Sequence, residues 1–217
     1  MSTRLTSLFF AAAFAVAAFA MTDTAVAKSA VNGVRPDTFI RTLADEALSV
    51  LSKKNGSTLA EREAKFHSVL RDDFAMDRIG RFAAGRYWRK MSRDERRDYQ
   101  KLFTEWVLKS YAIRFGGYSG ESLRILKTVR AGKKDSLVRS VIESTKNGKQ
   151  PIRVDWRVRR FKDSYKIIDI LVEGVSMLVT QKAEFASVIK REGIKGLISA
   201  LRTQLDQLKQ VATNGAS

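Results

Sequence analysis

The chain has 217 residues, no cysteine and a formal net charge of +17. The absence of cysteine excludes disulfides, thiol nucleophiles and thiolate metal sites. A single histidine, His67, cannot form a metal site of several imidazoles, and we expect it on the surface of a helix. No phosphate-binding loop, dinucleotide-binding glycine fingerprint or nucleophile elbow occurs in the sequence. We therefore expect no metal, no cofactor and no enzymatic activity.

The N-terminal segment has the layout of a cleavable secretory signal. Arg4 precedes an almost unbroken apolar stretch from Leu8 to Met21. The small residues Ala25-Val26-Ala27 suit a signal peptidase, so we predict that residues 1–27 are a signal peptide cut before Lys28. The alternative is a retained membrane anchor, although the apolar stretch is shorter than the ~20 residues of a spanning helix. After cleavage, residues 28–217 would form a single domain that keeps the charge of +17.

Capping residues and helical periodicity predict several helices in the first half of the chain. Pro36 opens a segment with apolar residues at helical spacing. Thr58 followed by Glu61 is a capping box, and Ser92 followed by Glu95 is another, so each pair predicts the start of a helix. The helix after Ser92 has a largely aromatic face, made of Tyr99, Leu102, Phe103, Trp106, Val107 and Tyr111.

The period changes to two after residues 116–117, which predicts strands. Turn sequences at residues 131–135 and 147–148 separate these strands. Alternation in residues 152–159 predicts a half-buried strand, whereas residues 165–172 are apolar on both sides except at Asp169, as is typical of a more central strand. Helical spacing returns on both sides of Gly193.

This order of elements predicts an α+β fold. The N- and C-terminal helices would pack on a curved four-stranded antiparallel sheet, in an arrangement similar to the NTF2 and cystatin folds. Helices and a curved sheet together can enclose an apolar cavity. The pattern of apolar residues leaves open whether that interior is filled or hollow.

Asp169 is the one carboxylate that could serve in catalysis. It lies between Ile168 and Ile170, where burial would raise its pKa and suit it to act as a general base on an apolar substrate. The alternative, which the sequence favours, is a structural carboxylate that pairs with an arginine or lysine of a neighbouring element.

The high positive charge raises the question of nucleic-acid binding. Export and the even spread of basic residues along the chain argue against it. The three tryptophans, Trp88, Trp106 and Trp156, lie at apolar periodic positions, which favours a place in the core over stacking on bases. Anionic lipid headgroups, lipopolysaccharide phosphates and acidic faces of membrane complexes are the alternative partners.

Four segments of the chain are similar to a known family. They are Phe74–Gly80, Gly85–Trp88, Tyr99–Tyr111 and Tyr165–Ser176. On these segments the chain resembles the MlaC family of periplasmic phospholipid-binding proteins, which includes toluene-tolerance proteins and close hopanoid-cluster relatives. The most specific motif is Asp-x-x-Val-Glu-Gly-Val-Ser, from Asp169 to Ser176, and the resemblance covers residues 36–208.

Two positions depart from the family pattern. Gln181-Lys182 stands where a Tyr-Arg pair is common, and Ala84 replaces a frequent leucine. The resemblance therefore supports the fold, but it does not carry over an arginine next to the lipid headgroup.

The resemblance implies a lipid carrier in the periplasm of a Gram-negative bacterium. Such a carrier shuttles a glycerophospholipid between an outer-membrane lipoprotein–porin complex and an inner-membrane ABC transporter with an MCE-domain subunit, and so maintains outer-membrane lipid asymmetry. The implied state is a monomer that contacts membrane surfaces transiently and does not bind nucleic acid. A carrier of hopanoids or other polyisoprenoid lipids is the alternative, and a cavity enzyme is a more distant one.

The candidate lining of the lipid cavity is a set of apolar residues on the predicted helices and strands. Those near the ends of elements, such as Tyr111, Phe115, Val175 and Met177, are candidates for a flexible mouth. The full set is Phe74, Ile79, Phe82, Trp88, Phe103, Trp106, Val107, Tyr111, Phe115, Val154, Trp156, Ile168, Ile170, Val172, Val175, Met177, Phe185, Ile189, Ile194, Leu197, Ile198 and Leu201.

Overall fold

The computed structural model describes residues 34–51, 58–114, 121–144, 150–162 and 164–214. The predicted signal peptide with its cleavage site, Phe115 and the predicted turn at residues 147–148 lie outside these ranges. Within them, no helix combines the length and the apolar character needed to cross a membrane.

The N-terminal helices begin where the capping residues predict them. In chain order they are α1 (Pro36–Leu51), α2 (Leu59–Asp73), α3 (Met76–Ala84), the 3₁₀ helix η1 (Gly85–Lys90) and α4 (Arg93–Arg114). Before α2, Thr58 Oγ1 accepts a hydrogen bond from the Glu61 N–H at 3.1 Å, and the Glu61 carboxylate accepts one from the Thr58 N–H at 2.9 Å. Ser92 and Glu95 form the same pair of bonds before α4. His67 is exposed on α2, as expected.

The strands form one antiparallel sheet in the order in which they occur in the chain. They are β1 (Ser122–Arg130), β2 (Asp135–Glu143), β3 (Ile152–Arg160), β4 (Tyr165–Val172) and β5 (Val175–Ser176). The prediction of an antiparallel sheet between two groups of helices is confirmed. The predicted number of four strands is wrong by one, because the two-residue β5 folds back on the end of β4.

β4 is not a central strand, contrary to the prediction. It is second from the edge, next to the short β5. Its apolar residues are covered by helices, since α2, α3 and α5 all contact it. A backbone bridge joins Phe74 to Ile167 of β4, and the Ala75 N–H donates to the Ile167 carbonyl at 3.0 Å. The pattern of a strand apolar on both sides therefore reports burial by any neighbour, not a place in the middle of a sheet.

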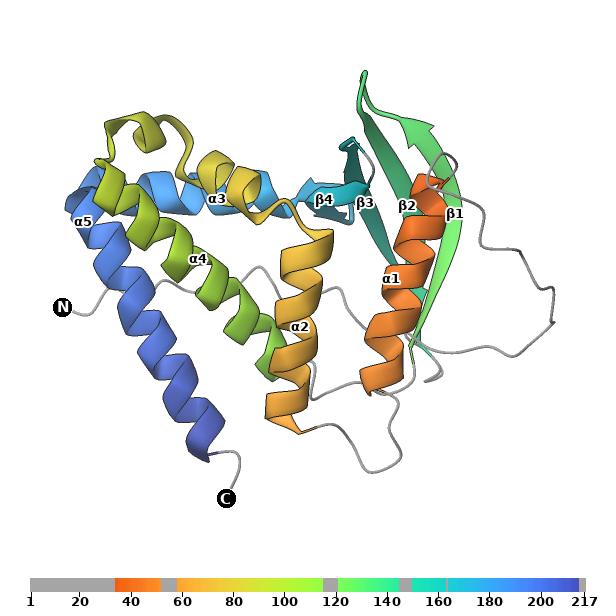
Figure 1. Cartoon of the computed structure of the whole chain (residues 1–217), viewed down its shortest axis with the longest axis horizontal. Helices are drawn as coiled ribbons and strands as arrows, with labels where there is room; N and C mark the ends of the chain where they lie inside the picture. Colours follow the sequence, from red (N-terminus) through yellow and green to blue (C-terminus); the bar gives the residue numbers. More distant parts are fainter. Residues whose placement is uncertain (1–33, 52–57, 115–120, 145–149, 163, 215–217) are drawn as a thin grey trace.

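The C-terminal helix α5 (Met177–Asn214) is broken at Gly193. Gly193 has a φ of +72°, in the left-handed region that favours glycine, so the helical path changes direction there. The two helices predicted on either side of Gly193 are thus confirmed as two arms of one element. Figure 1 shows the second arm running beside α4, and the first arm leading away from the sheet.

In the part of the chain that the structure describes, the buried apolar side chains form two clusters. The helical cluster consists of buried residues from α2, α3, α4, α5 and the loop before α4: Leu70, Met76, Ala83, Ala84, Met91, Tyr99, Phe103, Phe185, Val188, Ile189, Leu197, Ile198 and Leu201. The sheet cluster joins α1 and α2 to one face of the sheet: Ile40, Leu43, Val69, Val138, Ile142, Val154, Trp156, Val158 and Ile167. The half-buried Phe74 packs against both clusters.

Close approach of α3 and α4 depends on a glycine. A Cβ at Gly80 would collide with the side-chain amide of Gln100. Without that atom, the Gln100 amide reaches the Met76 carbonyl at 2.9 Å, and the buried Tyr99 hydroxyl donates to the Gly80 carbonyl at 2.9 Å. These bonds fix α3 against the helical cluster, and burial raises the pKa of Tyr99.

Candidate functional site

Nine of the predicted lining residues are buried inside the protein. Six belong to the helical cluster, two belong to the sheet cluster, and Met177 is buried at the start of α5. The six are Phe103, Phe185, Ile189, Leu197, Ile198 and Leu201, and the two are Val154 and Trp156. The ring of Phe185 lies 6.0 to 6.2 Å, centroid to centroid, from those of Tyr99, Phe103 and Trp106, so these side chains form the packed centre of the helical part.

Ten of the predicted lining residues are half-buried. This group keeps part of its apolar surface uncovered by other protein atoms, which is what contact with a lipid requires. It comprises Phe74, Ile79, Trp88, Trp106, Val107, Tyr111, Ile168, Ile170, Val172 and Ile194. Phe82 and Val175 are exposed, with 44% and 54% of their surface accessible to solvent.

A β-bulge in β4 decides which of its residues face the sheet cluster. Arg157 pairs with Asp169 while Val158 pairs with Ile167, so Ile168 is an extra residue without an opposite partner. Strict alternation would place Ile168 and Ile170 on the same face. The bulge instead directs Ile167 and Ile170 toward the sheet cluster. Ile167, which is completely buried, is not among the predicted lining residues, because no local sequence signal marks a bulge.

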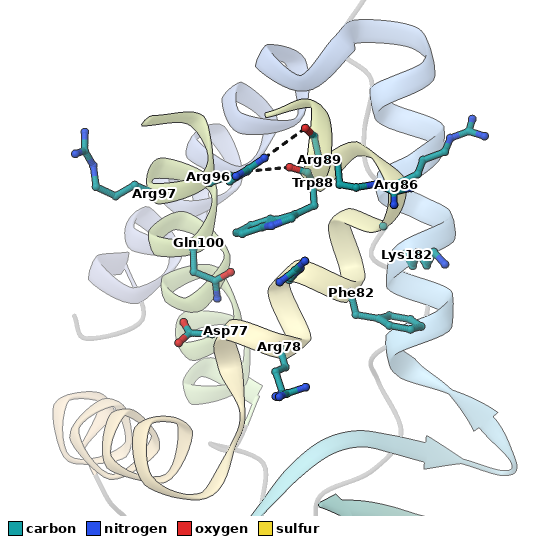
Figure 2. Close-up of a pocket in the computed structure, with 12 residues that line it drawn as sticks. Asp77, Arg78, Phe82, Arg86, Trp88, Arg89, Arg96, Arg97, Gln100 and Lys182 are labelled. Atoms are coloured by element: carbon teal, nitrogen blue, oxygen red, sulfur yellow. Dashed lines mark hydrogen bonds between the residues drawn. The ribbon is translucent and has the colours of Figure 1, made fainter. Parts of the chain in front are cut away.

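A pocket of about 950 Å³ opens between α3, η1, α4 and the start of α5 (Figure 2). We call it the cationic pocket because seven of its twelve lining residues are basic. The lining consists of Asp77, Arg78, Arg81, Phe82, Gly85, Arg86, Trp88, Arg89, Arg96, Arg97, Gln100 and Lys182. It is open to solvent and strongly charged, so it is not the apolar cavity that the sequence led us to expect. The apolar cavity itself stays a prediction.

Aromatic rings and backbone carbonyls hold several of the pocket's cations in place. Arg96 lies over the ring of Trp88 at 5.6 Å and donates hydrogen bonds to the carbonyls of Trp88 and Arg89, at 3.0 and 3.3 Å (Figure 2). Lys182 lies over the ring of Phe82 at 4.9 Å. The stem of Lys182 passes beside Gly85, whose φ of +58° suits glycine. The Gln181-Lys182 pair, one of the two departures from the family pattern, thus places a cation in this pocket.

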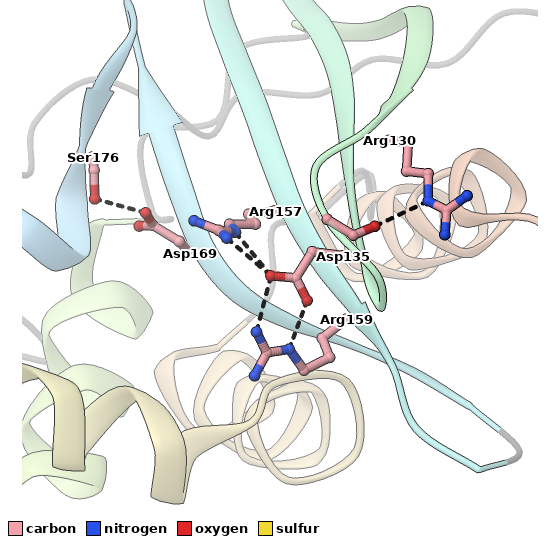
Figure 3. Close-up of polar contacts among 7 residues, drawn as sticks. Arg130, Asp135, Arg157, Arg159, Asp169 and Ser176 are labelled. Carbon is pink, nitrogen blue, oxygen red and sulfur yellow. Dashed lines mark hydrogen bonds and ion pairs between the residues drawn. The ribbon is translucent and has the colours of Figure 1, made fainter.

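Asp169 has a structural role at the start of α5 (Figure 3). One carboxylate oxygen accepts a hydrogen bond from the Ser176 hydroxyl at 2.6 Å, and the other accepts from the N–H groups of Ile170 and Leu178 at 2.8 and 3.1 Å. Ser176 Oγ in turn accepts from the Val179 N–H at 3.0 Å. Burial raises the pKa of Asp169, and these hydrogen bonds oppose that rise.

Asp169 and Ser176 therefore each satisfy one of the first N–H groups of α5, those of Leu178 and Val179. The prediction that Asp169 pairs with an arginine or lysine is wrong, because its hydrogen-bond partners are a hydroxyl and backbone N–H groups. Arg157, which faces Asp169 across the strands, binds Asp135 instead. Between Asp169 and Ser176, the turn from β4 to β5 is formed by Glu173 and Gly174, with Gly174 at a φ of +81°.

Asp135 is held by two arginines on the opposite face of the sheet from the sheet cluster (Figure 3). Arg159 bonds both carboxylate oxygens at 2.6 and 2.9 Å, and Arg157 bonds one of them at 2.9 Å. Hydrogen bonds from Arg159, and then from Arg157, lower the pKa of Asp135. This network joins β2 to β3 and closes the outer face of the sheet. The described residues contain no group of three or more acidic, histidine or cysteine side chains that could hold a metal ion.

The fold belongs to the class of α+β proteins with helices packed on an open antiparallel sheet. A solved structure of this class is the phospholipid-binding protein from Ralstonia solanacearum in complex with a phospholipid. It is similar to this chain with a TM-score of 0.65 and 24% sequence identity, over 79% of this chain and 97% of that one. The likeness shows that the two proteins share a fold.

Sequence comparisons identify the family. The model of the MlaC protein family matches residues 41–203, so the chain belongs to the MlaC family. The intermembrane phospholipid transport system binding protein MlaC from Haemophilus influenzae is 24% identical over 200 residues, which is 89% of this chain and 93% of that protein. The resemblance inferred from the sequence motifs is confirmed.

Proposed function

We propose that the protein is a periplasmic carrier of glycerophospholipids. The observation that carries the proposal is membership of the MlaC family, with a match that spans residues 41–203. The Ralstonia solanacearum relative of the same fold binds a phospholipid, and the Haemophilus influenzae relative bears the name of an intermembrane phospholipid transport protein.

The divided interior supports this proposal. A domain of this size ordinarily has one contiguous apolar core. Here the helical and sheet clusters are separate, and Phe74 packs against both. Half-buried apolar residues pack against each cluster, among them Trp106 and Val107 of α4 on the helical cluster and Ile170 of β4 on the sheet cluster. We assign the acyl chains to the boundary between the two clusters, with the lipid headgroup toward solvent.

A phospholipid needs a carrier to cross an aqueous compartment because its acyl chains are costly to expose to water. At about 0.8 kcal/mol for each buried methylene, two acyl chains of ~16 carbons cost on the order of 20 kcal/mol to expose to water. Spontaneous passage of such a lipid through an aqueous compartment is therefore negligible. The protein replaces the contacts of the membrane interior with apolar side chains, and no covalent chemistry is required.

The cellular location and the partners of the protein follow from the same proposal. Residues 1–27 act as a cleaved signal peptide, and residues 28–217 form the lipid-binding domain. The carrier exchanges its lipid with an outer-membrane lipoprotein–porin complex and an inner-membrane ABC transporter that has an MCE-domain subunit. N-terminal sequencing of the mature protein tests this part, because a retained apolar anchor would tether the domain to one membrane.

The decisive experiment is native mass spectrometry of protein purified from its own cell envelope, with extraction and identification of the bound lipid. We expect a diacyl glycerophospholipid at about one molecule per chain. A co-purified hopanoid would replace the proposed ligand with a polyisoprenoid lipid. A protein that is consistently empty would contradict the carrier function.

A further inference from the structure

We propose that the cationic pocket is a docking surface for the phosphate groups of anionic phospholipids at a bilayer surface. The inference rests on the proposed function for its purpose, which is to bring the carrier to a membrane. The binding itself can be measured separately from the lipid cargo.

The pocket presents positive charge that internal carboxylates do not neutralise. Asp77 is its one acidic lining residue, against six arginines and Lys182. Arg97 pairs with Asp94 on the exposed surface of α4. The guanidinium of Arg86 lies over the ring of Tyr87, and that of Arg78 over the ring of Phe161. A guanidinium has five N–H donors, so the ring contact of Arg86 and its single hydrogen bond to the Tyr87 hydroxyl, at 3.1 Å, leave further donors for an incoming anion.

The chemistry of these cations matches phosphate. A guanidinium is planar and donates two parallel hydrogen bonds to a pair of phosphate oxygens, which a single ammonium cannot do. The pocket is hollow, with a volume of about 950 Å³, and it opens to solvent. A headgroup can therefore enter it and approach the arginines that line it.

Exposed apolar residues beside the pocket favour a bilayer over an acidic protein. Within the described residues, five large apolar side chains are exposed, and two of them are Phe82 and Val179. Phe82 lines the pocket, and Val179 lies one helical turn before Lys182 on α5. Basic side chains next to phenylalanine and aliphatic residues are typical of surfaces that rest in the headgroup region of a membrane. Charge alone would suit either partner, and the apolar rim selects the lipid surface.

The test uses the mature protein and protein-free vesicles of phosphatidylcholine, made with or without phosphatidylglycerol. Co-sedimentation measures the fraction bound. We expect binding to the vesicles with phosphatidylglycerol, weakened by high salt because salt screens the attraction. The double variant Arg81→Gln/Arg89→Gln removes two exposed charges from the pocket, and we expect its affinity to fall at least tenfold, on the order expected for two basic residues at an anionic surface.

The matched control is Lys133→Gln/Lys134→Gln, on the exposed turn between β1 and β2. It changes the net charge by the same amount at a site outside the pocket, and we expect nearly wild-type binding. A third variant, Val179→Ser, leaves the charge unchanged, and we expect it to weaken binding severalfold through lost apolar contact.

Two results would overturn the proposal. The first is a failure of the wild-type protein to bind vesicles containing phosphatidylglycerol, which would leave an acidic protein as the partner. The second is an equal loss of binding in the pocket and control variants, which would reduce the effect to net charge. The co-purified lipid is measured in the same preparations. If a pocket variant loses vesicle binding but keeps its co-purified lipid, the effect belongs to the pocket and not to the lipid cargo. If the wild-type protein contains no lipid, the carrier function is contradicted.

Discussion

At the scale of single residues, three aspartates have different pKa values because their surroundings differ. Two arginines hold Asp135, so its pKa is lowered. Asp169 caps a helix, and burial raises its pKa against its hydrogen bonds. Asp73, at the end of α2, is half-buried, and its pKa is raised to about 6, mainly by burial and further by the charges of Glu46 and Asp72. Ionised Asp73 is therefore a cost to the folded state at neutral pH.

We predict that Asp73→Asn stabilises the protein at pH 7. Because the pKa of Asp73 is about 6 in the folded protein and near 3.8 in the unfolded chain, the folded state binds more protons between these values. The unfolding free energy of the wild type therefore falls as pH rises through about 6. Asparagine does not titrate, so the gain should be largest at pH 7 and vanish near pH 4. Thermal unfolding across this range measures it.

Asp72→Asn is the control for that prediction. Its neighbour Arg71 bonds the Asp72 carboxylate and lowers its pKa, so this substitution removes an ion pair. The charge of Asp72 raises the pKa of Asp73 less than burial does, so its loss relieves only a small part of that shift. We expect no stabilisation at pH 7 from Asp72→Asn. If Asp73→Asn lowered the melting temperature at pH 7, Asp73 would have a structural role that outweighs its burial.

At the scale of elements, the most specific sequence motif proves to be a junction between a strand and a helix. Asp169 on β4 and Ser176 on β5 together cap the start of α5. A carboxylate near a helix N-terminus also interacts favourably with the helix dipole. The motif therefore fixes the direction in which α5 leaves the sheet, and with it the position of Phe185 in the helical cluster.

We predict that Asp169→Ala lowers the free energy of unfolding by about 2 kcal/mol, because it leaves the partly buried N–H of Leu178 and the Ser176 hydroxyl without their acceptor. Urea unfolding followed by circular dichroism measures the change. The matched control is Asp72→Ala, which removes an exposed ion pair and should lower the free energy of unfolding much less than Asp169→Ala does. Equal effects of the two substitutions would contradict the capping role.

The capping boxes before α2 and α4 were predictable because each needs only residues three apart in the chain. The face of β3 that carries Val154, Trp156 and Val158 was predictable as well, because it needs only the alternation of apolar and polar residues along one strand. The bulge at Ile168 was not predictable, since it arises from how β4 registers against β3. The apolar character of β4 likewise came from helices distant in sequence, which the strand pattern alone could not distinguish from neighbouring strands.

At the scale of the whole molecule, the separation of the helical and sheet clusters is the feature most relevant to the proposed carrier. Helices α1 and α2 cover the sheet, while α4 packs mainly with α5 (Figure 1). The half-buried apolar residues of α4 therefore keep surface that other elements do not cover, which would be costly unless a ligand covers it.

We predict that Val107→Glu reduces the co-purified phospholipid at least tenfold, because a carboxylate at a half-buried position would have to be desolvated against the acyl chains. Lipid extraction and mass spectrometry measure the loss. The control is Leu126→Glu, at the exposed bulge of β1, which should keep its lipid. Circular dichroism checks that both variants are folded. Full lipid occupancy in a folded Val107→Glu variant would contradict the assigned position of the chains.

For the candidate lining residues, the sequence predicted which residues are apolar and periodic, but not which of them are covered by other side chains. Periodicity identified apolar faces correctly, so Phe103, Phe185 and Trp156 are all buried. It could not separate packed core from uncovered surface, because both have the same spacing of apolar residues. Phe82 illustrates the limit: it is one of the candidate lining residues of the apolar cavity, yet it is exposed in the cationic pocket.

The sequence by itself determined the order of elements, the helix starts and the family, because these depend on residues close together in the chain or on motifs that can be matched directly. Only the tertiary structure decided that basic residues from α3, η1, α4 and α5 converge on one pocket, and that the interior is divided into two clusters. Both results depend on which surfaces meet after the chain folds back at Gly85, Gly174 and Gly193, and contacts between residues far apart in sequence leave no local periodic signal.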